Sequence, residues 1–199
     1  MLVKHNNNSI SSITTPGSLV QGKMTLISEQ TASGSASISF TSGIDSTYPI
    51  YKFEFINIHP ATNTAKFTFQ VSTDGGSSYG VTATSSSFRA THNESGTTSS
   101  LAYDTSLDLA QSTSFASLNR SQGNASDENS GGTLTIFNPS STTFVKHWIA
   151  RNNIISNSNY QLDGFQAGYF NTTSAITNLK FQFSSGSIDD GIIKLYGVA

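Results

Sequence analysis

The chain has 199 residues, of which only 11% are Asp, Glu, Lys or Arg, and its formal net charge is -2. An average soluble domain has about 25% charged residues, and here Ser and Thr, at roughly 30% of the chain, make up the difference. This neutral composition argues against a nucleic-acid partner, which requires a basic surface, and against disorder, which couples low hydrophobicity with high net charge. The count of 0 cysteines excludes disulfides, thiolate metal sites and a cysteine nucleophile.

The length and the aromatic content suit one β-sheet core. Sandwiches and barrels reach about 200 residues as a single unit, and 13 Phe, 7 Tyr and 1 Trp supply large apolar surfaces for the interior. The first residues lack the apolar stretch of a secretory signal, and no segment approaches the ~18 apolar residues of a membrane span. We therefore expect a protein that is made and assembled in a cytoplasm, without membrane insertion.

The chain opens with a polar, Asn- and Ser-rich segment. Residues 1–23 predict an N-terminal arm of the kind that docks on a neighbouring subunit, and residues 24–199 predict the folded domain. Alternation of apolar and polar side chains predicts strands at 24–31 and 35–40. We expect these two strands to pair as a hairpin.

Two aromatic strands follow. Aromatic and charged residues alternate over 50–60, where Pro60 ends the strand, and apolar residues alternate with polar ones over 66–72. The sequence STDGGSSYG then carries the Asp-Gly signal of a tight turn. We therefore expect a second hairpin, with a returning strand at 79–84.

The middle of the chain is polar and shows less periodicity than its flanks. There we expect short strands at 88–92 and 101–104, one short helix within 104–118 capped by Asp104 or Thr105, and an exposed loop at 119–132.

The C-terminal third returns to strand patterns. The last segment, 191–198, is apolar on both faces, which favours an interior place in the sheet of its own subunit over pairing with a neighbour's edge. About ten strands and almost no helical periodicity predict an all-β, single-domain, jelly-roll-like antiparallel β-sandwich. The remaining elements that we expect are a hairpin of strands 133–137 and 143–150, a second Asn/Ser-rich loop at 151–163, and strands at 164–171 and 175–184.

No spacing in the sequence indicates a catalytic or metal site. The histidines form no His-x-His or H-E-x-x-H motif, no G-x-S-x-G or phosphate loop occurs, and no pair of carboxylates suggests a glycosidase. We therefore nominate no catalytic residue, no metal ligand and no cofactor, and we do not expect an enzyme. The histidines, which we assign to turns, surfaces or structural contacts, are His5, His59, His92 and His147.

Two acidic pairs leave one alternative open. Asp127-Glu128 and Asp189-Asp190 could each hold Ca²⁺ with backbone carbonyls as further ligands, although no EF-hand spacing supports this. Solvated turn residues are the preferred interpretation of both pairs.

Aromatic residues cluster near the C-terminus, and exposed rings are typical of carbohydrate-binding surfaces. Tyr169 and Phe170 are neighbours in a predicted strand and must face opposite sides, so at least one face could be exposed. Core packing is the preferred interpretation of any single ring, and the ligand-binding residues stay unknown. The rings of this stretch are Trp148, Tyr160, Phe165, Tyr169 and Phe170.

Four segments are similar to a known group of proteins: MLVKHNNNSI, STYPIYKFEFINIHPATNTAKFTFQVSTDGGSSY, FNPSSTTFVKH and SGSIDDGIIKLYGVA. Together they resemble virion structural proteins of marine tailed bacteriophages, including cyanophages. Asp190 departs from the group's pattern, in which a small hydroxyl-bearing or similar residue stands before Gly191. The resemblance brings no active-site residues.

The resemblance implies a structural component displayed on the phage particle, as a capsid decoration or cement protein or as a small tail appendage. It also implies assembly in the cytoplasm of a bacterial host, localisation in the virion, self-association as a homotrimer, and capsid or tail proteins as further partners. The alternative is a carbohydrate-binding module that recognises a host-surface glycan as receptor.

Overall fold

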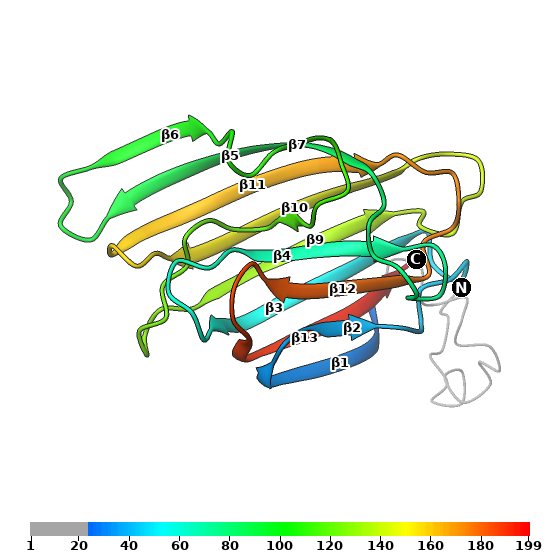
Figure 1. The fold of residues 1–199 in the computed structure, drawn as a ribbon, viewed down its shortest axis with the longest axis horizontal. Helices are drawn as coiled ribbons and strands as arrows, with labels where there is room; N and C mark the ends of the chain where they lie inside the picture. Colours follow the sequence, from blue (N-terminus) through cyan, green and yellow to red (C-terminus); the bar gives the residue numbers. More distant parts are fainter. Residues whose placement is uncertain (1–23) are drawn as a thin grey trace, which may run out of the picture.

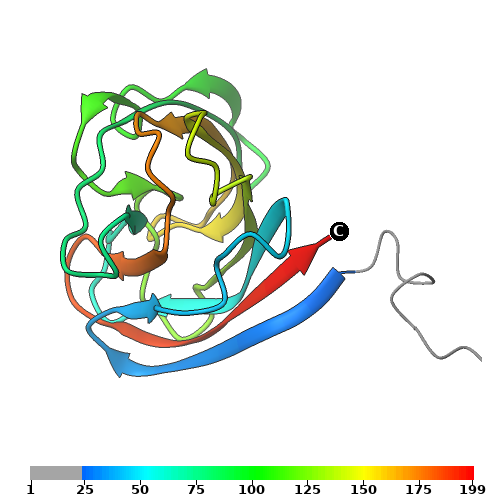
Figure 2. The same ribbon diagram turned by 90° about the vertical axis from the view of Figure 1, so that its right-hand side faces the viewer.

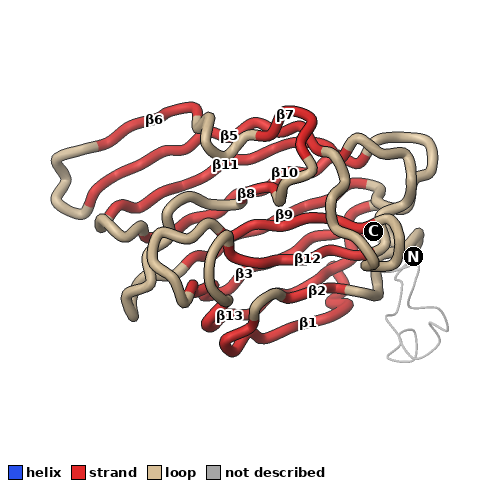
Figure 3. The backbone as a smooth tube through the Cα atoms, viewed as in Figure 1, coloured by secondary structure: helices blue, strands red, loops and turns tan. Residues whose placement is uncertain are grey.

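The computed structural model describes residues 24–199, which form two antiparallel β-sheets packed face to face (Figure 1). No helix occurs within this range, as Figure 3 shows. The strands are β1 (Met24–Ser35), β2 (Ile38–Phe40), β3 (Ile50–Pro60), β4 (Phe67–Ser72), β5 (Ala83–Asn93), β6 (Ser99–Tyr103), β7 (Leu109–Ser112), β8 (Ala116–Ser117), β9 (Ser130–Phe137), β10 (Lys146–Ile155), β11 (Tyr160–Phe170), β12 (Asn178–Phe183) and β13 (Ile188–Val198).

The two sheets differ in size. The larger sheet has 9 strands in the order β1-β13-β3-β9-β10-β11-β5-β6, with β7 also paired to β5, and the smaller has 4 strands in the order β2-β12-β4-β8. The larger sheet curves around the smaller one (Figure 2). Its β5–β6–β11 end extends past the smaller sheet, so part of its inner face is covered only by loops (Figure 1).

Aromatic rings fill the space between the sheets. Phe181 on β12 is central, because its ring centroid lies 5.2 Å from that of Phe53 and 5.4 Å from that of Phe55. Phe69 packs edge-on against Trp148 with centroids 5.1 Å apart. Edge-to-face aromatic pairs are worth about 0.5–1.5 kcal/mol beyond the apolar area that they bury. This interior explains why an aromatic-rich chain with few charges folds as a sandwich.

The prediction of an all-β sandwich is confirmed, whereas jelly-roll connectivity stays a prediction. The C-terminal strand also lies where its two apolar faces indicated. β13 pairs with β1 on one side and β3 on the other, with Met24 opposite Val198 and Leu195 opposite Phe53. It is therefore an interior strand of its own chain. The N-terminal arm, residues 1–23, lies outside the described residues.

Both N-terminal hairpin predictions are wrong. β1 belongs to the larger sheet and β2 to the smaller one, so the connection between them crosses from sheet to sheet. The turn at Asp74-Gly75-Gly76 likewise links β4 in the smaller sheet to β5 in the larger one. Gly75 and Gly76 adopt positive φ angles of 73° and 89°, as a tight turn requires. The Asp-Gly sequence correctly predicts a tight turn, but a turn does not determine which strands pair.

Two other segments also differ from expectation. Residues 104–118 contain β7 and β8 in place of a helix, and Asp104 supports a turn in which its Oδ1 accepts a hydrogen bond from the Ser106 backbone N–H at 3.2 Å. Residues 151–163 are mostly strand, because β10 and β11 continue as one long hairpin with Ile154 opposite Leu162. The predicted hairpin of β9 and β10 is confirmed.

Candidate functional site

The C-terminal aromatic rings divide between the core and the surface. Trp148 and Phe170 are 1% and 0% exposed and belong to the core, so neither ring can contact a ligand at the surface. Tyr169 lies on the opposite face of β11 from Phe170, as the strand alternation predicted. Tyr160 and Phe165 are half-buried and lie on opposite faces of the same strand.

The outer face is the face of the nine-stranded sheet that points away from the four-stranded sheet. Of the large hydrophobic residues that are exposed in 24–199, all but Phe144 lie on this face, as the strand registers show. Single exposed apolar residues are ordinary, whereas a contiguous group of them typically marks an interaction surface, and Phe165, Phe88 and Tyr103 lie in register on three neighbouring strands. These outer-face residues are Met24, Leu26, Ile56, Phe88, Leu101, Tyr103 and Ile149.

A shallow trough crosses the strands in the middle of the outer face. Its floor is low because Ala167 and Ser86, which lie opposite each other on β11 and β5, have short side chains. On one side a hollow of about 570 Å³ extends toward His147 and Tyr169. On the other side a hollow of about 310 Å³ extends toward Phe165 and its neighbours. Ile149, which is 55% exposed, contributes to both hollows.

One wall of the trough is a stack of planar groups. The rings of Phe88 and Phe165 are stacked with centroids 4.9 Å apart, and the Arg151 guanidinium lies 4.8 Å from the Phe165 ring centroid. Asp163 accepts hydrogen bonds from Arg151 Nε at 3.0 Å and Nη2 at 2.7 Å, and this pairing raises the pKa of Arg151. The wall is therefore rigid and carries no unpaired charge.

Two further ion pairs on the outer face also form within the chain. Lys52 Nζ lies 3.0 Å from Glu54 Oε1, and Lys194 Nζ lies 3.1 Å from Glu29 Oε2. The pairs are partly exposed and stabilise the fold little, since exposed ion pairs contribute about 0–1 kcal/mol. Their consequence is that an apolar face meets a partner without net repulsion.

A second polar cluster lies on the inner face, at the uncovered end of the larger sheet. Asp104 is 2% exposed and accepts hydrogen bonds from Arg89 Nη1 and, at 3.0 Å, from Arg120 Nη1. Burial would raise the pKa of the Asp104 carboxyl, but hydrogen bonds from Ser106 and Arg120 and the charge of Arg89 outweigh burial and lower it. Two cations thus share one ionised carboxylate.

The histidines and acidic residues that the sequence analysis singled out make separate structural contacts. The ring of His59 lies 3.1 Å from Ala125 O through Nε2 and 3.5 Å from Asp189 Oδ2 through Nδ1. Asp190 Oδ1 accepts a hydrogen bond from the Gly191 N–H at 2.7 Å, and Glu128 Oε2 accepts one from Ala125 N–H at 2.7 Å. His5 lies outside the described range.

Within 24–199, no three His, Asp or Glu side chains gather where they could hold a metal ion. His92 and His147 lie on exposed positions of β5 and β10, and the ring centroid of His147 is 6.0 Å from that of Tyr169. The described part of the chain has no helix that could cross a membrane.

One buried cation lies apart from both surfaces. Lys146 is 0% exposed, and its Nζ donates hydrogen bonds to Phe144 O at 2.6 Å and Thr172 O at 3.3 Å. No carboxylate within 24–199 pairs with it, and burial lowers the pKa of its ammonium group.

No known family model, curated protein or solved structure matches this chain. Two surfaces of the described residues could bind a partner: the outer face with its trough, and the inner-face cluster of Arg89, Asp104 and Arg120. Sequence reasoning missed both, although the alternation of Ile149 and Arg151 with buried Ala150 and Asn152 along β10 was a readable signal for the outer face. No comparable signal connected Arg89, Asp104 and Arg120, which lie on different strands and loops.

Proposed function

We propose that this chain is a self-associating structural component of a tailed-bacteriophage virion, displayed as a capsid decoration protein or small tail appendage and assembled as a homotrimer. The observation that supports self-association is the gathering of exposed apolar side chains on the outer face. The resemblance of the four sequence segments to phage virion proteins supports the setting.

Burial of the outer face would supply the free energy of association. Apolar surface removed from water contributes about 25 cal/mol per Å², and interface centres are typically aromatic or aliphatic residues surrounded by a polar rim. Ile149 and Phe88, which are 55% and 44% exposed, lie next to the trough and would lose most of their water contact in an interface. Only part of that gain becomes affinity, because association also costs translational and rotational freedom.

The outer face fits a second copy of this chain better than a charged partner. Charged side chains on this face, such as Arg151 and Asp163, form ion pairs within the chain, and the formal net charge of the whole chain is only -2. Copies of a chain with little net charge approach one another without strong repulsion.

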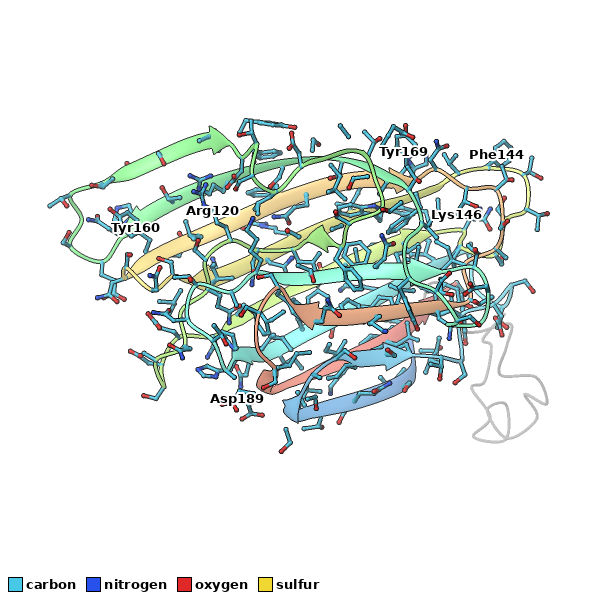
Figure 4. The ribbon with its side chains drawn as sticks, in the orientation of Figure 1. Arg120, Phe144, Lys146, Tyr160, Tyr169 and Asp189 are labelled. Atoms are coloured by element: carbon cyan, nitrogen blue, oxygen red, sulfur yellow. The ribbon has the colours of Figure 1, made fainter. Side chains whose placement is uncertain are left out.

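Phe144 offers a second contact for such a copy. It is 69% exposed on the turn before β10 and lies at the same end of the molecule as Tyr169 (Figure 4). An exposed ring on one subunit that packs into the trough of the next would be a heterologous contact, which forms a closed trimer when the rotation between neighbouring subunits is 120°.

The virion role is tested on particles. We expect mass spectrometry of gradient-purified virions of the phage that carries the gene to detect this chain in many copies, and immunogold labelling to place it on the capsid surface or the tail. Its absence from particles that contain the other structural proteins would overturn the proposal.

The alternative, a carbohydrate-binding module for a host glycan, changes its residues. Trp148 and Phe170 are excluded as ligand contacts because both are buried. Tyr160 keeps this function open, because its ring lines a hydroxyl-rich groove on the inner face.

A further inference from the structure

A groove of about 360 Å³ lies on the inner face where β5, β6 and β11 extend past the smaller sheet. Ligand pockets for small molecules start at about 300 Å³, so the groove is large enough for a saccharide unit. Figure 4 shows Arg120 and Tyr160 at this end of the sheet, far from Tyr169. The groove is thus separate from the outer-face trough.

Two arginines line this groove. Arg89 projects from the inner face of β5 and Arg120 from the loop after β8, and their side chains are 23% and 41% exposed. Both pair with Asp104, whose lowered pKa keeps it ionised at neutral pH. Two guanidinium charges against one carboxylate leave a net charge of about +1 at the groove.

The guanidinium groups retain donors for a ligand. Each has five N–H donors, and among residues 24–199 the only acceptor for either group is the Asp104 carboxylate, reached through Nη1. No acceptor among residues 24–199 therefore occupies the N–H donors on Nε and Nη2 of either arginine, and these donors can bind a ligand. Because Asp104 holds both groups in place, little side-chain entropy is lost when an anion binds.

The remaining walls are rich in hydroxyl groups and contain one aromatic ring. Thr91 Oγ1 and Ser100 Oγ both line the groove and lie 2.6 Å apart across β5 and β6, so the hydroxyl that accepts this hydrogen bond keeps its own O–H free to donate. Ser158 and Tyr160 line the opposite side. Hydroxyls that both donate and accept hydrogen bonds, beside a ring with an apolar face, match the alternating polar and C–H surfaces of a sugar.

We propose that this groove binds the carboxylate of an acidic saccharide, such as a uronic or sialic acid, through Arg89 and Arg120, with the sugar ring against Tyr160. The planar guanidinium fork matches a carboxylate in two parallel hydrogen bonds. The hydroxyl-lined walls explain why a saccharide fits better than a bare ion. A small net charge on the whole chain gives no long-range attraction for nucleic acid.

The test is isothermal titration calorimetry on the full-length chain with glucuronic acid and N-acetylneuraminic acid, each compared with neutral glucose and with acetate and sulfate. We expect at least one acidic saccharide to bind about tenfold or more tightly than glucose, acetate and sulfate, since a charge-assisted hydrogen bond is worth about one such factor. Binding of acetate or sulfate as tight as that of the saccharides would overturn the saccharide assignment. Failure of both acidic saccharides to bind would overturn the site.

Variants locate the binding. Arg120→Gln and Tyr160→Ala should each weaken the saccharide about tenfold, whereas Arg151→Gln, which removes an exposed arginine from the outer face, should leave it unchanged. Tyr160→Ala leaves the Asp104 cluster intact, so it tests the groove even if Arg120→Gln unfolds, which thermal melting would reveal. An equal loss in Arg151→Gln would overturn the location. The saccharide site does not rest on the proposed virion role, because the titration gives the same result whether or not the chain is found in particles or forms trimers.

Discussion

The rings of Phe88 and Phe165 lie parallel on the outer face, with centroids 4.9 Å apart and planes inclined by only 5°. They are direct register partners on β5 and β11, and Arg151 lies against the other side of the Phe165 ring. Cross-strand aromatic pairs are a main source of side-chain stabilisation within a sheet. The wall of the trough is therefore ordered before any partner binds, which lowers the entropic cost of an interface.

The Phe88–Phe165 pair should show a measurable coupling in a double-mutant cycle. We expect Phe88→Ala and Phe165→Ala together to destabilise the fold by about 0.5–1.5 kcal/mol less than the sum of the two single changes. Urea denaturation at low protein concentration, where subunits are dissociated, provides the free energies of unfolding. Strict additivity would show that the two rings do not interact in solution.

Replacement of Trp148 should damage the fold and not a binding surface. Trp148 is 1% exposed and packs against Phe69, so Trp148→Ala is expected to lower the free energy of unfolding by about 3–5 kcal/mol. Tyr169→Ala, at a half-buried position next to it in the sheet, should cost clearly less. Because the chain has 1 Trp, its fluorescence follows the core directly, and unfolding should shift the emission to the red. An emission spectrum that does not change on unfolding would contradict the burial of Trp148.

Lys146 should make stability depend on pH in the alkaline range. Burial lowers the folded-state pKa below the ordinary value of 10.5, so between these two values the unfolded chain binds a proton that the folded chain does not. Stability therefore rises with pH across this window, and below it the buried ammonium imposes its full cost. Lys146→Met should be more stable than the wild type at neutral pH, with a difference that narrows toward about pH 10.5.

Lys146→Arg serves as the matched control, because a guanidinium stays charged throughout this range. It should remain less stable than Lys146→Met at every pH, as measured by chemical denaturation. If the difference in free energy of unfolding between the wild type and Lys146→Met is constant from neutral pH to about pH 10.5, the pKa of Lys146 is not lowered in the folded chain.

Asp104 should contribute stability that is lost in acid. Its folded pKa is lowered, so the contribution is fully present above the unfolded pKa of about 3.9 and disappears as the pH falls through the lower folded value. Asp104→Asn removes the carboxylate that Arg89 and Arg120 share and should cost about 3 kcal/mol at neutral pH.

The control for Asp104 is Asp163→Asn, which breaks the more exposed pair with Arg151. This change should cost only about 0–1 kcal/mol, because solvent already screens that pair. Equal losses for the two variants, measured by urea denaturation, would show that burial of Asp104 does not strengthen its ion pairs.

Strand positions could be predicted from the sequence because alternation is a local property. Strand partners could not, as β1 shows: its first residue, Met24, lies opposite Val198 at the other end of the chain. The two N-terminal hairpin predictions failed for the same reason, since turn residues specify a reversal of direction but not a choice of sheet. The position of 191–198 was the exception, because an apolar strand is more favourable in the interior of a sheet than at an exposed edge.

Polar residues misled the prediction where tertiary contacts satisfy them. The Asn and Ser content of 151–163 predicts a loop, yet Asn152 is 3% exposed and its Nδ2 donates to Leu118 O at 3.1 Å. Such a partner, 34 residues away, is invisible to local patterns. The Arg89–Asp104–Arg120 cluster was missed for the same reason, whereas the opposite orientations of Tyr169 and Phe170 followed directly from strand geometry.

The central claim, self-association through the outer face, is tested most directly by size-exclusion chromatography with multi-angle light scattering on the full-length chain. Ile149→Glu places a charge at the trough, where the side chain is 55% exposed and the monomer should tolerate it. Ser46→Glu adds the same charge to an exposed loop between β2 and β3 and serves as the control. The account predicts a trimer for the wild type and for Ser46→Glu, and a folded monomer for Ile149→Glu. A wild-type monomer, or a trimer that persists in Ile149→Glu, would contradict it.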